Sequence, residues 1–275
     1  MSERDMNRNL ANIPIDEVAI ETIRMYAPRE GYWLADSGGK DSCVVRDLVM
    51  RSGVKFDAHY GVSPVDPPEV RRFLREYHPD TAWERSRYSA LALAKSHGML
   101  PTRKVRWCCA EWKERGGAGR TVLTGIRAGE STRRARRKTL EVCYRTPGKR
   151  YLHPILWWTT AEVWAYIHNR GLPYCNLYDE GQQRIGCVLC PMTRCVEEQM
   201  ARWPRIAALW RRMAHVAWEV GNRRTDLKSP WSSADDYFAW WLDRDAPAPQ
   251  GMPLLDDLDD TDTPMSASCE DKEGG

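Results

Sequence analysis

The amino-acid sequence predicts an α/β protein, in which a parallel sheet with helices on both faces is followed by a smaller, mostly helical C-terminal part. In the first 150 residues, short apolar segments of strand character alternate with segments of helical periodicity, which is typical of a parallel sheet. Beyond Tyr151 the pattern is mostly helical. With 275 residues, the chain is long enough for one large domain and an appendage.

The elements expected in the first 150 residues follow one another in a regular order. The first helix has apolar residues near helical spacing, and a tight glycine-rich turn separates the first strand from the second helix. A proline pair opens a later helix, because proline is tolerated in the first turn. The expected elements are a helix at 15–27 that ends before Gly31, a strand at 32–35, a helix through 43–49, a strand at 56–62, a helix from Pro67 and a strand at 121–124.

The second half of the chain is expected to contain two further helical regions. Thr159 and Glu162 have the spacing of a capping box that opens a helix, and Gly171 closes it. Another helical region spans 196–219, and after Arg244 the sequence becomes rich in Pro and Asp, which predicts disorder. We therefore divide the chain into an α/β domain at 1–150, a helical part at 151–245 and an acidic disordered tail at 246–275.

The composition favours a soluble globular protein. Apolar residues make up 42% and charged residues 29% of the chain, which argues against a disordered one. The polar N-terminus lacks the apolar stretch of a signal peptide, and no run approaches the roughly 18 apolar residues that cross a bilayer. We expect a cytoplasmic protein with no membrane partner. Its nine cysteines are then metal ligands or catalytic thiols before they are disulfides.

The net charge of +3 conceals a strongly basic segment. Residues 131–138, STRRARRK, contain five basic residues, whereas residues 251–275 contain eight acidic residues and one lysine. The run from Arg133 to Lys138 is a candidate site for a phosphate-bearing partner such as a nucleic-acid acceptor, and a solvated helix face is the alternative. Trp107 and Trp112 could stack on bases, although core packing explains each of them as well.

The most informative feature is the turn SGGKDS between an apolar strand and an apolar helix. Consecutive glycines let the backbone approach an anion, and the following helix directs its free N–H groups and its positive dipole end toward that anion. The spacing differs from that of the GxxxxGK[ST] loop of common nucleotide triphosphatases. A glycine-rich turn without a ligand is the alternative. The candidate phosphate-binding residues are Ser37, Gly38, Gly39, Lys40, Asp41 and Ser42, of which Lys40 adds a positive charge and Asp41 can hold magnesium.

Four cysteines in two short segments form a candidate metal site. Cys108 and Cys109 are adjacent, and Cys187 and Cys190 form a C-x-x-C. Zinc is more commonly held by two C-x-x-C pairs, and an adjacent pair fits more easily around an iron–sulfur cube than around a small tetrahedral ion. Buried apolar cysteines are the alternative to a metal site. A second quartet is also compatible with the spacing, and it comprises Cys175, Cys187, Cys190 and Cys195.

Three further cysteines have no such pattern. Cys43 lies on the helix after the glycine-rich turn and is expected in the core. The sequence identifies no partner for Cys143. Cys269 lies in the acidic tail, as an inert passenger or as a reactive thiol.

Together, these motifs resemble those of a known enzyme family. The turn is similar to the SGGxDS loop of the N-type ATP pyrophosphatases, which hold the pyrophosphate part of ATP. From about Gly31 to Met192 the chain resembles the phosphoadenosine-phosphosulfate (PAPS) reductase family, in the segments SGGKDS, VDPPEV, RWCCAEWK, TGIRAGES and YDEGQQRIGCVLCP. The resemblance implies an adenine nucleotide alpha hydrolase-like fold, nucleotide contacts by Gly125 and Arg127, and a [4Fe-4S] cluster on Cys108, Cys109, Cys187 and Cys190.

Two departures from the family pattern bear on the reaction. Sulfonucleotide reductases usually carry a degenerate version of the loop, and they end in a Glu-Cys-Gly-Leu-His type motif with a nucleophilic cysteine. Here the loop is intact and the tail reads Ser268-Cys269-Glu270-Asp271. In these respects the chain is similar to the DNA-phosphorothioation enzymes of the DndC type and to the PP-loop tRNA thiolases, which activate a substrate with ATP.

The function expected first is therefore ATP-dependent sulfur transfer. ATP–magnesium would be cleaved to AMP and pyrophosphate with Lys40 and Asp41 as catalytic residues, and sulfur from a donor protein or the cluster would enter an activated acceptor, such as a nucleic acid held by Arg133–Lys138. The first alternative is reduction of adenylylsulfate or PAPS to sulfite, with Cys269 as the thiol. The second is a non-catalytic nucleotide-binding accessory protein, in which the metal only joins the helical part to the sheet.

Overall fold

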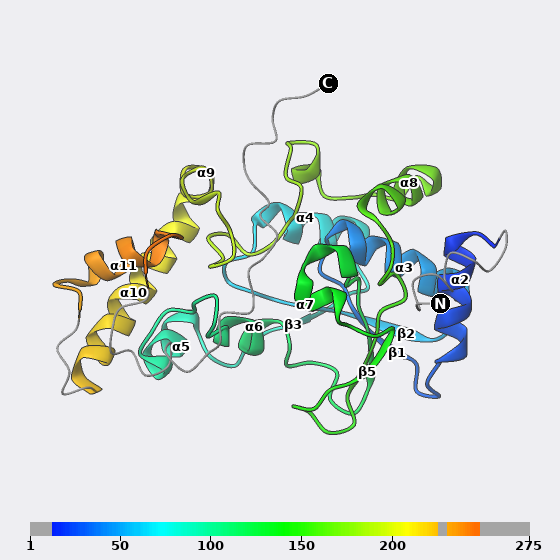
Figure 1. Cartoon of the computed structure of the whole chain (residues 1–275), viewed down its shortest axis with the longest axis horizontal. Coiled ribbons are helices and arrows are strands. Elements are labelled where there is room, and N and C mark those ends of the chain that lie inside the picture. Colours follow the sequence, from blue (N-terminus) through cyan, green and yellow to red (C-terminus); the bar gives the residue numbers. More distant parts are fainter. Residues whose placement is uncertain (1–12, 225–229, 248–275) are drawn as a thin grey trace.

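A computed structural model of the chain describes residues 13–224 and 230–247. Its centre is a six-stranded sheet in the order β3-β2-β1-β4-β6-β5 (Figure 1). Residues 248–275, which include Cys269 and most of the predicted acidic tail, lie outside the described residues. The strands are β1 (Tyr32–Ala35), β2 (Phe56–Gly61), β3 (Ala82–Glu84), β4 (Thr121–Leu123), β5 (Leu140–Val142) and β6 (Arg150–Leu152).

The pairing of the strands confirms the predicted parallel sheet. β1 pairs with β2 and β4, and all pairs from β3 across to β6 are parallel, with Leu34 opposite Ala58 and Leu123. β5 runs antiparallel to β6 at one edge. β3, β5 and β6 were not expected from the sequence, because each is short and contains a charged residue, whereas the equally short β4 is fully buried and was predicted. β6 lies at the boundary that the sequence places at residue 150.

Helices pack against both faces of the sheet, as the sequence predicts. Two of the turns near the nucleotide loop are short 3₁₀ helices, η1 (Ala128–Glu130) and η2 (Asn176–Tyr178). The α-helices are α2 (Ile15–Met25), α3 (Lys40–Ser52), α4 (Pro68–Tyr77), α5 (Ala90–His97), α6 (Trp107–Trp112), α7 (Thr132–Ala135), α8 (Thr160–Arg170), α9 (Val196–Arg202), α10 (Pro204–Arg224) and α11 (Ala234–Leu242).

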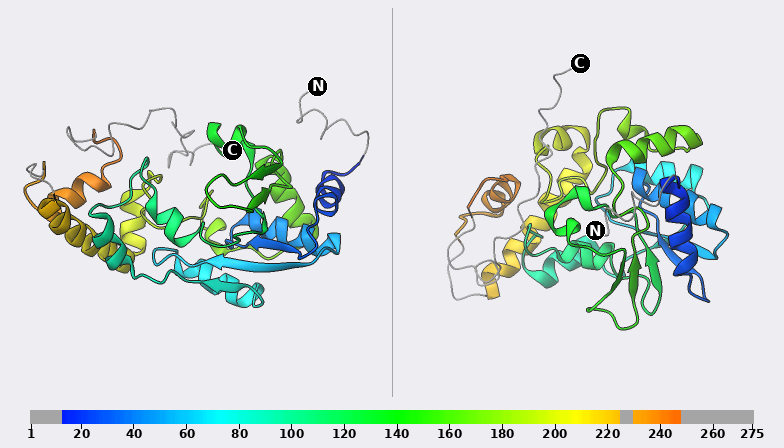
Figure 2. Two further views of the ribbon diagram at one scale, coloured as in Figure 1. Left: turned by 90° about the horizontal axis from the view of Figure 1, so that it is seen from below. Right: turned by 45° about the vertical axis from the view of Figure 1, so that its right-hand side comes forward.

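The buried side chains form two clusters. One joins α2, α3 and α8 to strand β1, and the other joins α4 and α5 to the C-terminal helices. Helices α9, α10 and α11 gather with α5 at one end of the molecule, while α2 and α8 lie at the other end (Figures 1 and 2). Trp107 and Trp112 are buried in the second cluster, so they pack in the core and do not offer faces to bases.

Several predicted helix boundaries are confirmed and two are corrected. Thr159 and Glu162 form the reciprocal capping box of α8, and Gly171 ends that helix at φ 60°. The first helix ends at Met25, before the predicted 27. The region predicted at 196–219 is two helices, which break between residues 202 and 204 because the residue before Pro204 is disfavoured in helical conformation. No helix in the described ranges is long and apolar enough to cross a membrane.

Candidate functional site

The predicted phosphate loop lies between β1 and α3, at the carboxyl edge of the sheet. Gly38 has a φ of 70°, and a Cβ there would come within 3.0 Å of Val70 Cγ1, so both the conformation and the packing require glycine. Gly39 is the N-cap of α3. Ser42 Oγ donates to the Gly39 carbonyl at 2.8 Å and lies 3.2 Å from Ser37 Oγ. The first N–H groups of α3 and the loop hydroxyls therefore meet at one place, as in anion-binding helix termini.

Asp36, a buried carboxylate that was not predicted as a site residue, stabilises the glycine turn by hydrogen bonds. Asp36 accepts hydrogen bonds from the Gly38 amide at 3.2 Å, from His78 Nδ1 at 2.7 Å and from Thr81 Oγ1 at 3.0 Å. Burial opposes its ionisation, but the hydrogen bond from His78 and the charges of His78 and Arg46 hold the Asp36 pKa below its ordinary value. Asp36 is therefore an anion that fixes the glycine turn.

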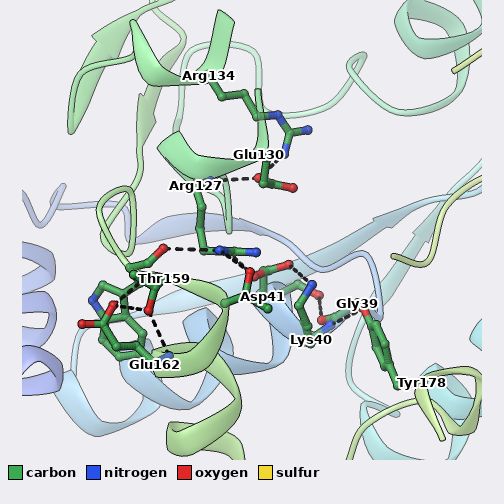
Figure 3. A network of polar contacts seen from close by, with 12 residues as sticks. Gly39, Lys40, Asp41, Arg127, Glu130, Arg134, Thr159, Glu162 and Tyr178 are labelled. Atoms are coloured by element: carbon green, nitrogen blue, oxygen red, sulfur yellow. Dashed lines mark hydrogen bonds and ion pairs between the residues drawn. The ribbon is translucent and has the colours of Figure 1, made fainter. Parts of the chain in front are cut away.

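The two residues predicted to be catalytic form an ion-pair network with Arg127. Arg127 Nε donates to Asp41 Oδ1 at 2.7 Å, and Lys40 Nζ lies 3.2 Å from Asp41 Oδ2 (Figure 3). One amino group of Arg127 also donates to the Trp158 carbonyl at 3.3 Å and to Thr160 Oγ1 at 3.2 Å. Arg127 is 4% exposed and Lys40 is 5% exposed. The structure thus brings Lys40, Asp41 and Arg127 together, although they come from two segments.

Gly125 permits this arrangement by a close approach of backbones. A Cβ on Gly125 would lie 2.8 Å from the Asp41 carbonyl carbon and 2.9 Å from its oxygen. The segment after β4 therefore packs directly on the first turn of α3, which carries Lys40 and Asp41. Glycine at position 125 is therefore required for the close spacing between the two loops.

Alanine in place of Gly125 is expected to push the first turn of α3 away from Arg127. Such overpacking costs about 1–3 kcal/mol of unfolding free energy. If the same energy is lost from nucleotide binding, the affinity falls by about 5-fold to 150-fold. Urea denaturation and calorimetric titration with ATP–magnesium measure the two effects. Gly129→Ala is the matched control, because nothing lies within 4 Å of a Cβ at Gly129. Equal behaviour of the two variants would show that the contact with Asp41 is unimportant.

Tyr178 is a site residue that the sequence analysis missed. Its hydroxyl accepts a hydrogen bond from the Lys40 amide at 3.0 Å, and Lys40 Nζ lies 5.5 Å from the centre of its ring (Figure 3). Burial raises the pKa of the hydroxyl, which stays protonated at neutral pH. The segment that contains Tyr178 carries part of the family resemblance, but only the fold shows that η2 covers the start of α3.

His153 supports the same region from β6. Its Nδ1 lies 2.6 Å from Thr124 Oγ1, next to Gly125, and its Nε2 lies 3.6 Å from Glu141 Oε2. Burial lowers the pKa of His153 from 6.5 to about 4, with Glu141 opposing the shift. The imidazole is therefore neutral in the folded protein at physiological pH.

Acidification is expected to destabilise the protein through His153. The unfolded chain takes up a proton near pH 6.5 and the folded chain only near pH 4, so stability is full above 6.5 and falls between these values. The loss amounts to about 3 kcal/mol. Urea denaturation between about pH 7 and about pH 5 should show about 2 kcal/mol of this fall in the wild type and a smaller one in His153→Gln. Parallel pH dependence in the two proteins would contradict the assignment.

The four cysteines predicted to bind metal come together from two segments. Cys108 and Cys109 lie on α6, and the charges of Cys187 and Cys190 act on the pKa of Cys108, which places both segments close in space. A hydrogen bond from the Cys108 thiol, helped by Arg106 at 3.1 Å from Cys109 Sγ, lowers the Cys109 pKa to about 6. A thiolate is the form that binds metals. In the described part of the chain, no group of three or more His, Cys, Asp or Glu is arranged to hold a single metal ion.

Cys187 also belongs to a buried polar network. Its thiol donates to Asp66 Oδ1 at 3.4 Å, and Lys113 Nζ donates to the same oxygen at 3.0 Å. Tyr60 donates its hydroxyl proton to the other oxygen of Asp66. Burial raises the pKa of Cys187 to about 12, although Lys113 opposes this. Asp66 and Lys113 therefore connect the VDPPEV and RWCCAEWK segments to the C-x-x-C.

The other cysteines lie in different surroundings. Cys43 and Cys175 are both buried in the core, so the predicted core position of Cys43 is confirmed. Cys143 is half-buried near the β5–β6 hairpin. Among the described cysteines, Cys195 is the one that is not a free thiol, because it is disulfide-bonded. The structure places Cys187 and Cys190 near Cys108 of the adjacent pair.

The basic run is partly engaged within the protein. Arg134 pairs with Glu130, and Arg137 Nη1 lies 2.6 Å from Glu141 Oε2. Arg136 and Lys138 are exposed. Desolvation lowers the pKa of Arg134, and the positive charge of Arg184 lowers it further, whereas the negative charge of Glu130 raises it. The part of the run that faces solvent is therefore smaller than the sequence indicates.

A family model described as "Phosphoadenosine phosphosulfate reductase domain" matches residues 31–193. The adenosine 5'-phosphosulfate reductase of Allochromatium vinosum is 32% identical over 190 residues, which are 62% of this chain and 72% of that protein. An uncharacterised protein of Escherichia phage 186 is 33% identical over 151 residues, and one of Methanocaldococcus jannaschii is 26% identical over 223 residues. These matches cover 48% and 69% of this chain, but only 45% and 42% of the phage and archaeal proteins.

Two solved structures are similar in part. The PAPS reductase of Candida auris, in its phosphate complex, aligns with 68% of this chain and 96% of its own, at 23% identity and a TM-score of 0.46. The FMN adenylyltransferase of Candida glabrata in complex with ATP aligns with 67% of this chain and 68% of its own, at 15% identity and a TM-score of 0.46.

Proposed function

The chain belongs to the phosphoadenosine phosphosulfate reductase family, and we propose that it is an enzyme of this family that cleaves ATP to AMP and pyrophosphate and uses the AMP to activate an acceptor for sulfur transfer. One observation carries the proposal. Asp41 lies at the N-terminus of α3, between Lys40 and Arg127, in a loop whose glycine turn is held by Asp36. This combination of anion-binding backbone, two cations and a carboxylate suits a magnesium–pyrophosphate group.

Each residue of the loop has a role in this reaction. The amides that follow Lys40 in the first turn of α3, together with the hydroxyls of Ser37 and Ser42, would bind the β- and γ-phosphates. The Lys40 amide donates to Tyr178, and the Lys40 ammonium group would neutralise the charge that develops on departing pyrophosphate. Asp41 would bind the magnesium ion. Arg127 keeps the Asp41 carboxylate in place through its Nε and would donate to phosphate with its remaining N–H groups.

The proposed chemistry has two steps. An acceptor oxygen attacks the α-phosphorus, the bond from that phosphorus to the bridging oxygen breaks, and pyrophosphate leaves while the acceptor proton passes to solvent. A sulfide equivalent from a donor protein then forms a bond to the activated carbon, and AMP leaves with the former acceptor oxygen. Positioning of the phosphates and stabilisation of the leaving group would supply most of the rate enhancement.

The cysteine set fits an iron–sulfur cluster in its chemistry. Four thiols from two segments converge, and Arg106 and Lys113 place positive charge beside them. Cys108, Cys109, Cys187 and Cys190 would hold a [4Fe-4S] cluster, which supplies electrons or sulfur when bound.

A nucleic-acid acceptor is the partner that the basic run supports. Arg136 and Lys138 are exposed beside α7, which follows directly on the Arg127 loop. Phosphate contacts from such residues position a nucleic acid without reading its sequence.

Reduction of a sulfonucleotide is the second candidate, and the similarity to the reductase of Allochromatium vinosum favours it. In that reaction a thiolate attacks the sulfur of adenylylsulfate, AMP leaves, and a second thiol releases sulfite as the two thiols become a disulfide. The tail thiol that the sequence offers, Cys269, lies outside the described residues.

Product analysis with two nucleotides tests the proposal. The full chain, purified without oxygen, is incubated with ATP–magnesium and an RNA and DNA mixture, and separately with adenylylsulfate and dithiothreitol. We expect AMP and pyrophosphate from ATP, with Asp41→Asn lowering the rate on the order of 100-fold. Asp57→Asn, which alters an exposed carboxylate paired with Arg120, is the control. Sulfite formation that requires Cys269 would replace our proposal with the reductase, and no turnover of either nucleotide would favour an accessory protein.

A further inference from the structure

The C-x-x-C segment contains a strained residue. Leu189, between Cys187 and Cys190, has a φ of 55° and is fully buried, and no other described residue except glycine has a positive φ. A side chain in this left-handed region costs about 1–2 kcal/mol and persists only where the surroundings enforce it. The turn that spaces the two cysteines therefore depends on contacts from outside the segment.

Two polar side chains from the C-terminal part make those contacts. Gln199 Oε1, on α9, accepts the Leu189 amide at 2.7 Å, and Gln199 Nε2 donates to Thr193 Oγ1 at 3.2 Å. Arg244, which follows α11, donates to the carbonyls of Leu189 and Cys190, both at 3.3 Å, and to that of Thr193 at 3.0 Å. One guanidinium group thus binds three carbonyls of the turn.

Further donors satisfy the neighbouring carbonyls. Trp210 Nε1, on α10, donates to Val188 O at 2.9 Å, and Arg103 Nε donates to Pro191 O at 3.2 Å. The ring of Trp241 lies 5.0 Å from the Arg244 guanidinium, and the Trp241 backbone carbonyl accepts a hydrogen bond from Arg244 Nη1. Side chains from α10, the segment after α11 and Arg103 therefore bind the carbonyls of this turn, and Gln199 of α9 binds the Leu189 amide.

We propose that Gln199 and Arg244 are positioning residues that fix the Cys187–Cys190 turn as a metal-ligand pair, so that the C-terminal helices complete the site which the family domain begins. The proposal rests on the proposed function in one respect, that these cysteines are ligands. Both residues lie after residue 193, where the family match ends. Without them, Leu189 would relax to an unstrained backbone conformation and the spacing between the two thiols would change.

The experiment compares Arg244→Ala, Arg244→Lys and Gln199→Ala with the wild type, each as the full chain purified without oxygen. Iron, acid-labile sulfide and the visible spectrum report the cluster. We expect a 10-fold to 100-fold faster loss of iron to a chelator, roughly the effect of removing a residue that orients a ligand. Lysine should not restore the wild-type rate, because an ammonium group cannot reproduce a planar fork to three carbonyls. Arg211→Ala, on the exposed face of α10 and paired with Asp235, is the matched control.

A second measurement keeps the proposal testable if the protein carries no iron. Alkylation of the metal-free chain by iodoacetamide, followed by peptide mapping, should be faster at Cys187 and Cys190 in Arg244→Ala and Gln199→Ala than in the wild type. The rates at Cys108 and Cys109 and the affinity for ATP should stay unchanged, which excludes general unfolding. If both variants retain iron and are alkylated at the wild-type rates, Gln199 and Arg244 do not position the Cys187–Cys190 turn and the proposal is wrong. Absence of iron from the wild type, with faster alkylation in the variants, would instead contradict only the metal assignment.

Discussion

Arg127→Ala is expected to abolish nucleotide turnover and to destabilise the fold at the same time. The side chain is 4% exposed and is bound to Asp41, to the Trp158 carbonyl and to Thr160. Removing one partner of a buried ion pair costs about 3–5 kcal/mol when the other is left uncompensated, and Lys40 beside Asp41 keeps the loss at or below the lower end of that range. Because Asp41 would lose its fixed position, the rate of pyrophosphate release should fall on the order of 100-fold or more.

Urea denaturation and a pyrophosphate-release assay measure these two effects. Arg120→Ala is the control, since Arg120 also pairs with an aspartate, Asp57, at 2.6 Å, but at the surface. An exposed pair of this kind contributes about 1 kcal/mol or less. A similar loss in the two variants would mean that the Arg127–Asp41 pair has no special role. Arg127→Lys should recover little activity, because lysine cannot make the three directed contacts.

The second large effect is expected from serine substitutions in the cysteine set. Cys109→Ser and Cys190→Ser each remove a proposed thiolate ligand from one of the two segments, so the protein purified without oxygen should lack the iron and the broad visible absorption that the proposed cluster gives to the wild type. If structural metal binding contributes to folding, these variants should also unfold at a lower denaturant concentration.

Elemental analysis of the same samples separates the metals. Cys175→Ser and Cys143→Ser are the controls, because the structure places neither thiol with the four. Both controls should keep the wild-type iron content. Stoichiometric zinc in the wild type would replace the cluster with a zinc site, and wild-type iron in Cys109→Ser would remove that residue from the ligand set.

The sequence predicted local features of the fold reliably. The capping box of Thr159 and Glu162 and the proline start of α4 depend on residues within one helical turn, so spacing alone reveals them. Longer strands were found by their apolar runs. β3, β5 and β6 were missed, because pairing with a neighbouring strand stabilises them more than their own composition does.

The sequence predicted the candidate site residues that lie within a consecutive motif, and it missed those that are distant in the chain. The glycine turn and the four cysteines stand out because consecutive residues define them. Asp36 directly precedes the turn. Aspartate side chains often accept the backbone N–H two residues later, so the hydrogen bond from the Gly38 amide could have been predicted from the sequence. Its partner His78 lies 42 residues away and gives no signal in the sequence.

By itself, the sequence determined the class of fold, the glycine-rich turn before α3 and the presence of paired thiols, since backbone conformation and residue chemistry follow from neighbours in the chain. The tertiary structure decided which distant side chains complete each site. Arg127 reaches Asp41 across 86 residues, Tyr178 reaches the Lys40 amide across 138, and Arg244 reaches Cys190 across 54. Such contacts depend on how helices and strands pack, and packing is a property of the whole chain that no local pattern encodes.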